Sequence, residues 1–137
     1  ERYKPRLVVD VATLTGASMI ALGQHASAIM TPSEELEMMF RKLGEESGDY
    51  VWPFPLWEEY EDAIKGITGD VSNIASSGNT RYAGVINAGM FLYQFAKNYP
   101  WVHVDMAPRI TPAKNDILAK GATGAPMQLL IKLLEEY

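Results

Sequence analysis

The sequence predicts one globular domain with an α/β layer architecture, and three observations lead to this prediction. Short runs rich in β-branched residues alternate along the chain with segments of helical periodicity. Of the 137 residues, 47% are hydrophobic and 21% are charged, which is the composition of a globular protein of one domain. Cysteine is absent, which excludes a disulfide scaffold, a thiolate metal site and a cysteine nucleophile.

Charge and hydropathy argue against two classes of partner. The net charge of -5 and the pI near 5.0 disfavour nucleic acid and anionic membrane as main partners. Apolar stretches are interrupted well short of the ~18 residues that a membrane span needs. The chain begins at Glu1 without a methionine or a signal peptide, and we expect it to be a piece of a longer protein, cut just before a core strand.

The first elements are a strand, a helix and a strand. Residues 6–12 form a β-branched run between Pro5 and a turn at residues 13–16, which predicts a buried strand. Residues 16–22 predict a short helix that is rich in small side chains, and residues 26–30 predict a second strand. The chain is therefore expected to pass from its first strand through a tight turn directly into a helix.

The next helix has the clearest signals in the sequence. Thr31 is the expected N-cap, with Pro32 at the first helical position and Glu34 completing a capping box. Gly48 is the expected stop. The apolar stripe follows the i, i+3, i+4, i+7 pattern and consists of Leu36, Met39, Phe40 and Leu43.

The middle of the chain is less regular. Residues 52–55 cannot be helical, because each of their two prolines forces the preceding residue into extended geometry. Residues 56–64 predict a helix whose acidic side chains face solvent. Residues 66–83 form a long polar segment without periodicity, and such segments in compact domains are functional or mobile.

The last third predicts a helix, a strand and a helix. Residues 84–98 are apolar almost all round, which predicts a buried helix. Residues 101–106 predict a strand, and residues 107–124 a loop. The final helix is expected to begin near Pro126 and to bury Met127, Leu130, Ile131 and Leu134.

Four titratable residues are candidates for chemistry. Asp10 and Asp105 lie within apolar strands, where an ionised carboxylate must find a partner. A partner among backbone N–H groups, or an Arg or Lys side chain, is the simpler interpretation, and catalysis is the alternative. His103, beside Trp101, indicates a hydrogen-bonded core imidazole rather than a metal ligand, and His25 is expected to be solvated. No HExxH, phosphate-loop or GxSxG motif occurs.

The end of the first strand is the strongest candidate for a binding site. Residues 10–17 leave a strand at its carboxyl end, turn and enter a helix, and open α/β sheets bind ligands at such ends. The strand at residues 101–106 delivers the small Ala107 to a second strand end. Two ordinary strand–loop connections are an equally acceptable interpretation of this pattern.

Six segments of the chain form a recognisable series. The two most specific are Asp-Val-Ala-Thr-Leu-Thr-Gly-Ala at residues 10–17 and Trp-Val-His-Val-Asp-Met-Ala at residues 101–107, and the others are residues 48–56, 70–74, 83–92 and 120–124. In their sequence and their order along the chain, these segments resemble the leucine aminopeptidase (cytosol aminopeptidase) family of dinuclear-metal metallopeptidases. The resemblance runs from about Pro5 to the C-terminus.

The resemblance implies a fold, an activity and a cofactor. The fold is part of a mixed β-sheet layered between helices, with residues 1–137 as the C-terminal portion of the catalytic domain. The activity is release of N-terminal amino acids, with a leucine-type preference, by two divalent metal ions, Zn or Mn. The family's signature Asn-Thr-Asp-Ala-Glu-Gly-Arg is absent from this chain. Metal ligands and catalytic residues are therefore expected upstream, and none on this chain, which should be inactive alone.

What the resemblance carries over to this chain is a wall of the substrate site. The backbone of residues 13–16 would contact the substrate main chain, with the first side-chain pocket beside it. The pocket for the following residue would be bordered by Ile74. The implied substrate-binding residues are Thr13, Leu14, Gly16, Ile74, Ala107 and Ile110. The sequence departs from the family pattern in two places. Pro108-Arg109 replaces a pair consisting of glycine and an apolar residue, which affects the shape of the pocket, and the loop at residues 75–81 is slightly longer than usual.

The resemblance also implies partners and a location. The implied partners are peptide substrates, the upstream part of the same catalytic domain, and further copies of the protein in a hexamer. The implied location is the cytoplasm. A nucleic-acid role is disfavoured by the acidic balance. The alternative from another class is a non-catalytic assembly or structural module of the same fold, whose upstream half has lost its ligands.

Overall fold

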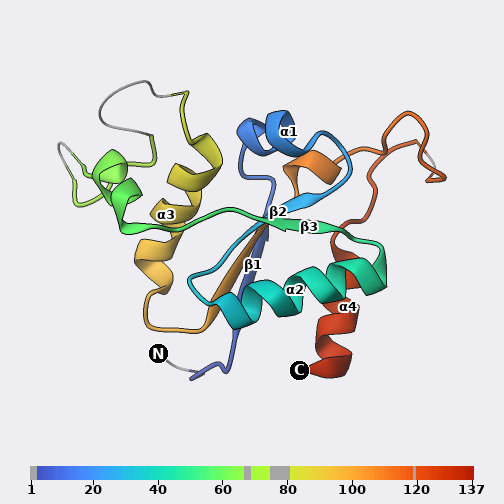
Figure 1. Cartoon of the computed structure of the whole chain (residues 1–137), viewed down its shortest axis with the longest axis horizontal. Coiled ribbons are helices and arrows are strands. Elements are labelled where there is room, and N and C mark those ends of the chain that lie inside the picture. The colour runs from blue at the N-terminus through green and yellow to red at the C-terminus, as the bar shows by residue number, and fades with distance from the viewer. Residues whose placement is uncertain (1–2, 67–68, 75–80, 119) are drawn as a thin grey trace.

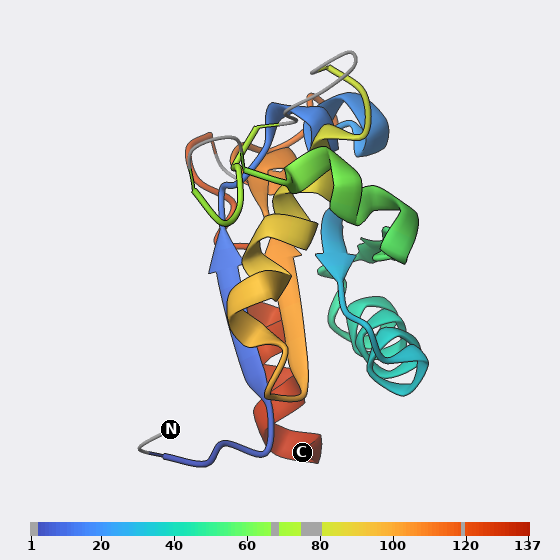
Figure 2. The same cartoon turned by 90° about the vertical axis from the view of Figure 1, so that its left-hand side faces the viewer.

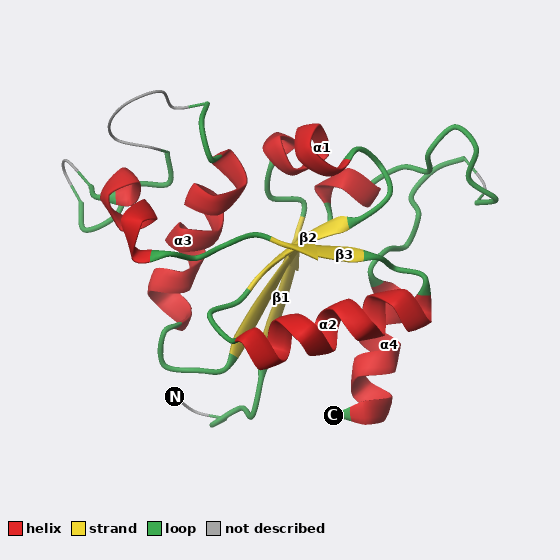
Figure 3. Ribbon diagram, viewed as in Figure 1, coloured by secondary structure: helices red, strands yellow, loops and turns green. Residues whose placement is uncertain are grey.

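The computed structural model describes residues 3–66, 69–74, 81–118 and 120–137. Its centre is a four-stranded sheet in the order β1-β4-β2-β3, built from β1 (Val8–Ala12), β2 (Ser27–Met30), β3 (Val51–Pro53) and β4 (Trp101–Asp105) (Figure 3). The β1–β4 and β2–β3 pairs are parallel, whereas the β2–β4 pair is antiparallel. The sheet is mixed, and the predicted α/β class is confirmed.

Helices cover both faces of this sheet. They are α1 (Gly16–Leu22), α2 (Glu34–Ser47), α3 (Gly84–Ala96) and α4 (Met127–Glu136), with the short 3-10 helices η1 (Glu58–Ile64) and η2 (Ala107–Arg109). Figures 1 and 2 show α3 and α4 on opposite sides of β1 and β4, with α2 on the side of α4. Helix α3 packs closely against β2: a Cβ atom added at Gly89 of α3 would lie 2.2 Å from Met30 Sδ of β2.

The side chains of β4 alternate between the two faces, as strand geometry requires. Val102 and Val104 belong to the apolar cluster shared with α2 and α4. The ring of Trp101 instead stacks on Tyr93 of α3, with centroids 5.7 Å apart. Every residue of β4 is buried, so the sheet carries an aliphatic face and a face that includes polar side chains.

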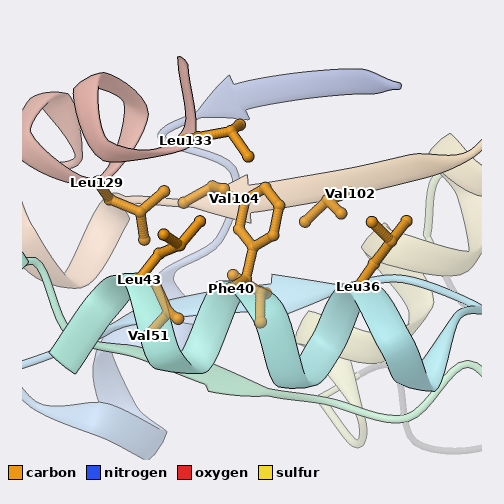
Figure 4. Packing of buried hydrophobic residues seen from close by; sticks show 9 residues of the cluster. Leu36, Phe40, Leu43, Val51, Val102, Val104, Leu129 and Leu133 are labelled. Carbon is orange, nitrogen blue, oxygen red and sulfur yellow. The ribbon is translucent and has the colours of Figure 1, made fainter. Parts of the chain in front are cut away.

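The main core lies between α2, α4 and the sheet. Figure 4 shows Phe40 of α2 pointing toward Val102 and Val104, with side chains of α4 beside it. The predicted stripe of α2 is confirmed for Leu36, Phe40 and Leu43, which are buried, whereas Met39 is only partly buried. Gly48 ends α2 as expected, in the left-handed conformation with φ 80°.

The predicted start of α2 was wrong by two residues. Ser33, and not Thr31, is the N-cap: its hydroxyl accepts a hydrogen bond from Leu36 N at 3.3 Å. The Thr31 hydroxyl accepts from Ser33 N at 3.2 Å and closes a turn before the helix. Two hydroxyls stand near this helix end, and the one that reaches a free N–H of the first turn is the cap.

Four other parts of the chain differ from the predictions. The extended residues 52–55 include an additional strand, β3, which tolerates Pro53 because it lies at the edge of the sheet. The helix expected at residues 56–64 is the 3-10 helix η1. Helix α3 ends at Ala96, and Phe95 is 70% exposed, so this helix is not buried all round. The loop expected at residues 107–124 contains η2.

The buried face of α4 was predicted incorrectly. Leu129 and Leu133 are buried and Leu130 is partly buried, whereas the other three predicted positions, Met127, Ile131 and Leu134, are exposed. The helix is apolar over more than half of its circumference, so docking on α2 and the sheet decides which stripe faces inward. An apolar groove of about 500 Å³ remains between α4 and β1, lined by Arg6, Leu7, Val9, Leu130, Leu133, Leu134 and Tyr137.

This groove runs beside β1, an edge strand that pairs only with β4 among the strands described. Unpaired strand edges next to apolar surface promote association. We therefore expect the isolated chain to self-associate, and sedimentation velocity at several concentrations measures this. Leu134→Lys should weaken association by placing a charge in the groove, whereas Ile117→Lys, at a fully exposed position elsewhere, should not. A monomer at every concentration would contradict the expectation.

Within the described ranges, no helix combines the length and the apolar character that crossing a membrane requires.

Candidate functional site

Two strand ends meet at one edge of the sheet. Because β1 and β4 are parallel and Ala12 pairs with Asp105, their carboxyl ends lie side by side, and Met106 N donates to Ala12 O at 2.9 Å. From β1 the chain passes through residues 13–15 into α1, where the Thr15 hydroxyl accepts from Ser18 N at 3.0 Å and caps the helix. The predicted turn between strand and helix is confirmed.

The Asp105 carboxylate joins these two strand ends. Its Oδ1 accepts from Leu14 N at 3.0 Å and from Ala107 N at 3.1 Å. Its Oδ2 accepts from Thr15 N at 3.1 Å and from the Thr15 hydroxyl at 2.7 Å. The side chain is completely buried, and these four donors fill the acceptor positions of a carboxylate. The prediction that this acid finds backbone N–H partners is confirmed.

Asp10 and His103 form a second polar pair, one strand apart. His103 is completely buried, and its Nδ1 hydrogen-bonds to Asp10 Oδ1. Trp101 Nε1 donates to Asp10 Oδ2 at 2.6 Å. The prediction of a hydrogen-bonded core imidazole is confirmed. His103 Nε2 is buried and has no hydrogen-bond partner among the residues that the structure describes. His25 is exposed, as expected.

Five of the six predicted substrate-binding residues lie at this edge. Thr13 and Gly16 are exposed and Leu14 is partly buried, and the Thr13 hydroxyl donates to Met106 Sδ at 3.1 Å. Ala107, in η2, is only 2% exposed, so its methyl group is covered by neighbouring residues. Ile110 follows η2, is 39% exposed, and donates from its N–H to Ala107 O at 3.3 Å.

The sixth predicted residue, Ile74, belongs to a different segment from the other five. It lies between η1 and α3 and is 61% exposed. Its N–H and its carbonyl both hydrogen-bond to the Ser72 hydroxyl, within the same segment. Among the described residues, no hydrogen bond connects Ile74 with the turn or with Ala107. The expectation about the length of the loop at residues 75–81 falls mostly on residues 75–80, which are outside the described ranges.

Sequence reasoning noted Arg109 as a departure but missed what it does. Its Nη1 donates to Gln24 O at 2.6 Å and lies 3.3 Å from Asp116 Oδ2, and its side chain is 11% exposed. The Thr123 hydroxyl donates to Arg109 O. Arg109 thus ties the loop after η2 to the end of α1. A basic residue between two apolar ones, followed seven positions later by Asp116, is the signal that could have identified this pair.

The acidic residues of η1 have no place in this site. Glu58, Glu59 and Asp62 are exposed, as predicted for a solvated face. A hydrogen bond from Lys65 lowers the pKa of the Asp62 carboxyl, and the same contact raises the pKa of Lys65. Both groups are fully exposed, so the pair is a surface feature.

The residues of the described ranges do not fit a metal centre. No group of three or more His, Cys, Asp and Glu side chains comes together there. The two strand carboxylates are already engaged: Asp105 by four donors, and Asp10 by Trp101 and His103. A two-metal site needs carboxylates free to bridge ions about 3.5–4 Å apart, and this chain offers no such pair in the parts described.

Comparisons with known proteins place these segments in one family. The model of the cytosol aminopeptidase family, catalytic domain, matches residues 1–131. A probable cytosol aminopeptidase of Azoarcus sp. (strain BH72) is 43% identical over 134 residues, which are 98% of this chain and 25% of the relative. A probable cytosol aminopeptidase of Histophilus somni (strain 129Pt) is 44% identical over 98% of this chain and 26% of its own length.

A solved structure has the same fold. A mutant of tomato leucine aminopeptidase superposes with a TM-score of 0.80 at 30% sequence identity, over 93% of this chain and 24% of that chain. The chain spans about a quarter of the length of the curated relatives that it matches. The match to the family model, which covers nearly all of the 137 residues, is decisive for membership. The chain belongs to the cytosol aminopeptidase family, and it corresponds to part of that family's catalytic domain.

Proposed function

We propose that residues 1–137 are the C-terminal portion of the catalytic domain of a metal-dependent aminopeptidase, which releases N-terminal amino acids from peptides with a leucine-type preference. One observation carries this proposal. The two segments that most resemble the family, at residues 10–17 and 101–107, meet at the carboxyl ends of β1 and β4, where Asp105 joins them. That edge is where α/β folds bind ligands.

In this proposal the chain supplies one wall of the substrate site. The backbone of residues 13–16 contacts the substrate main chain, and Thr13 and Gly16 border the pocket for the first side chain. Ala107 and Ile110 are assigned to the floor of that pocket: Ile110 is exposed there, whereas Ala107 is 2% exposed and lies below the accessible surface. Ile74 borders the pocket for the second residue. The exposure of Thr13, Gly16 and Ile110 supports this assignment, because these residues remain accessible to a substrate.

The reactive groups belong to the rest of the polypeptide. Members of the family use divalent metal ions, and the residues described here do not fit such a centre. We therefore assign the metal ligands and the catalytic residues, with two Zn or Mn ions, to the upstream part of the catalytic domain. The groove beside β1 is the surface that this part would cover. The proposed enzyme is a homo-oligomer, a hexamer, in the cytoplasm.

The test compares the intact protein with the isolated chain. The intact protein should hydrolyse leucine p-nitroanilide, lose activity when a chelator removes its metal, and recover it with Mn or Zn. The isolated chain should hydrolyse nothing, and calorimetry with either ion should detect no stoichiometric binding. Tight binding of two ions by the isolated chain would overturn the assignment of the ligands. A folded intact protein that binds no metal and hydrolyses no substrate would favour the assembly module instead.

A further inference from the structure

We propose that Asp105 is a positioning residue, which fixes the Thr13–Gly16 turn and Ala107 relative to one another so that the turn presents its carbonyl groups to the substrate main chain. This inference rests on the proposed function, because it concerns the same wall of the site. It adds a residue that touches no substrate and acts through the backbone of two segments that do.

The carboxylate connects two segments that are far apart in sequence. Oδ1 bridges Leu14 N, after β1, and Ala107 N, at the start of η2. Oδ2 holds both the N–H and the hydroxyl of Thr15. Charged acceptors make the stronger hydrogen bonds in proteins, and burial strengthens them further. One completely buried side chain therefore sets the separation between the turn and η2.

The same bonds determine where the carbonyl groups of the turn point. In a trans peptide the C=O and N–H groups point in opposite directions. Because Thr15 N–H donates to Asp105, the carbonyl of Leu14, in the same peptide unit, points away from the buried carboxylate. The hydrogen bond from Leu14 N–H to Asp105 likewise turns the carbonyl of Thr13, in the preceding peptide unit, away from the carboxylate. Two consecutive acceptors are thus turned away from Asp105, and the ligand chemistry that fits them is the N–H donors of a peptide main chain.

The first experiment uses Asp105→Asn in the intact enzyme. An amide of the same shape turns an N–H₂ group toward one of the two pairs of donors, so the turn loses at least one acceptor in either orientation of the amide. We expect kcat/KM for leucyl substrates to fall about a hundredfold, since a displacement of about 1 Å has effects of that size. The loss should appear mainly in kcat, because a misaligned peptide still binds. Metal content should stay at the wild-type value, because the ligands lie elsewhere.

Asp10→Asn is the matched control. It makes the same change in the neighbouring strand, where the carboxylate binds Trp101 and His103. Among the described residues, no hydrogen bond joins Asp10 to the turn. Per folded enzyme, its kcat/KM should remain that of the wild type, even if its melting temperature falls. Equal losses in kcat for the two variants would mean that both carboxylates act only through stability, and would overturn the proposal.

A second pair of variants decides the matter if Asp105→Asn does not fold. Thr15→Val removes the hydroxyl that donates to Oδ2, and Thr15→Ser keeps it. A loss of kcat in the valine variant at an unchanged melting temperature, which the serine variant recovers, supports the proposal. A valine variant as active as the wild type overturns it, and so does a loss that the serine variant shares. A wild-type protein that hydrolyses no peptide overturns the proposed function and this inference together, whereas active wild type with unchanged Asp105→Asn overturns only the inference.

Discussion

Replacing Gly16 by valine in the intact enzyme should lower kcat/KM for leucyl substrates about tenfold or more, and leave glycyl substrates nearly unaffected. A Cβ at Gly16 meets no described atom within 4 Å, so the fold accepts the larger side chain. In the proposed site this open space belongs to the first substrate side chain. A leucine excluded from it loses burial of about 1.5–3 kcal/mol, and about 1.4 kcal/mol corresponds to a factor of ten.

The control for this variant is Ala21→Val on the same helix. Ala21 is exposed and lies in the last turn of α1, away from the residues assigned to the substrate. Steady-state kinetics with leucine and glycine p-nitroanilides should separate Gly16→Val from both the control and the wild type. An equal loss for both substrates would show that Gly16 acts through structure, and no loss would refute the assignment of the pocket to this turn.

Replacing Phe40 by alanine should lower the free energy of unfolding by about 3–5 kcal/mol, as expected for loss of a buried aromatic side chain. Phe40 is completely buried and lies at the centre of the cluster that joins α2 and α4 to the sheet (Figure 4). Because the free energy of unfolding of native proteins is roughly 5–15 kcal/mol, the cavity left by this substitution should remove a large part of the stability. Urea unfolding followed by tryptophan fluorescence measures the difference.

Met38→Ala is the control, because Met38 lies on the same helix but is 60% exposed. Its effect should be within about 0.5 kcal/mol, as for most surface substitutions. Both variants must be compared at one protein concentration, because self-association raises apparent stability. Similar midpoints for the two variants would show that the interior between α2, α4 and the sheet is not the main core.

Local patterns in the sequence were enough to locate most elements. The strands β1 and β4 were predicted from β-branched runs, and the apolar stripe of α2 from its helical period. The prediction that the first strand is buried was wrong, because β1 lies at an edge of the sheet and all of its residues are partly buried or exposed. The turn between β1 and α1 and the need of Asp105 for buried partners were also predicted, because an ionised group inside an apolar strand cannot stay unpaired. Family membership followed from short motifs in a fixed order.

Only the tertiary structure decided which of several compatible choices the chain makes. The sequence patterns predicted Thr31 as the cap of α2 and the wrong stripe of α4 as its buried face. In the structure Ser33 caps α2, and Leu129 and Leu133 of α4 face inward. Three of the four donors to Asp105 belong to Leu14 and Thr15, about 90 positions earlier in the chain. No local pattern contains such a pairing, because it exists only once parallel β1 and β4 place their carboxyl ends together. The sequence by itself thus determined the elements and the family, whereas the long-range contacts that build the candidate site depend on the fold.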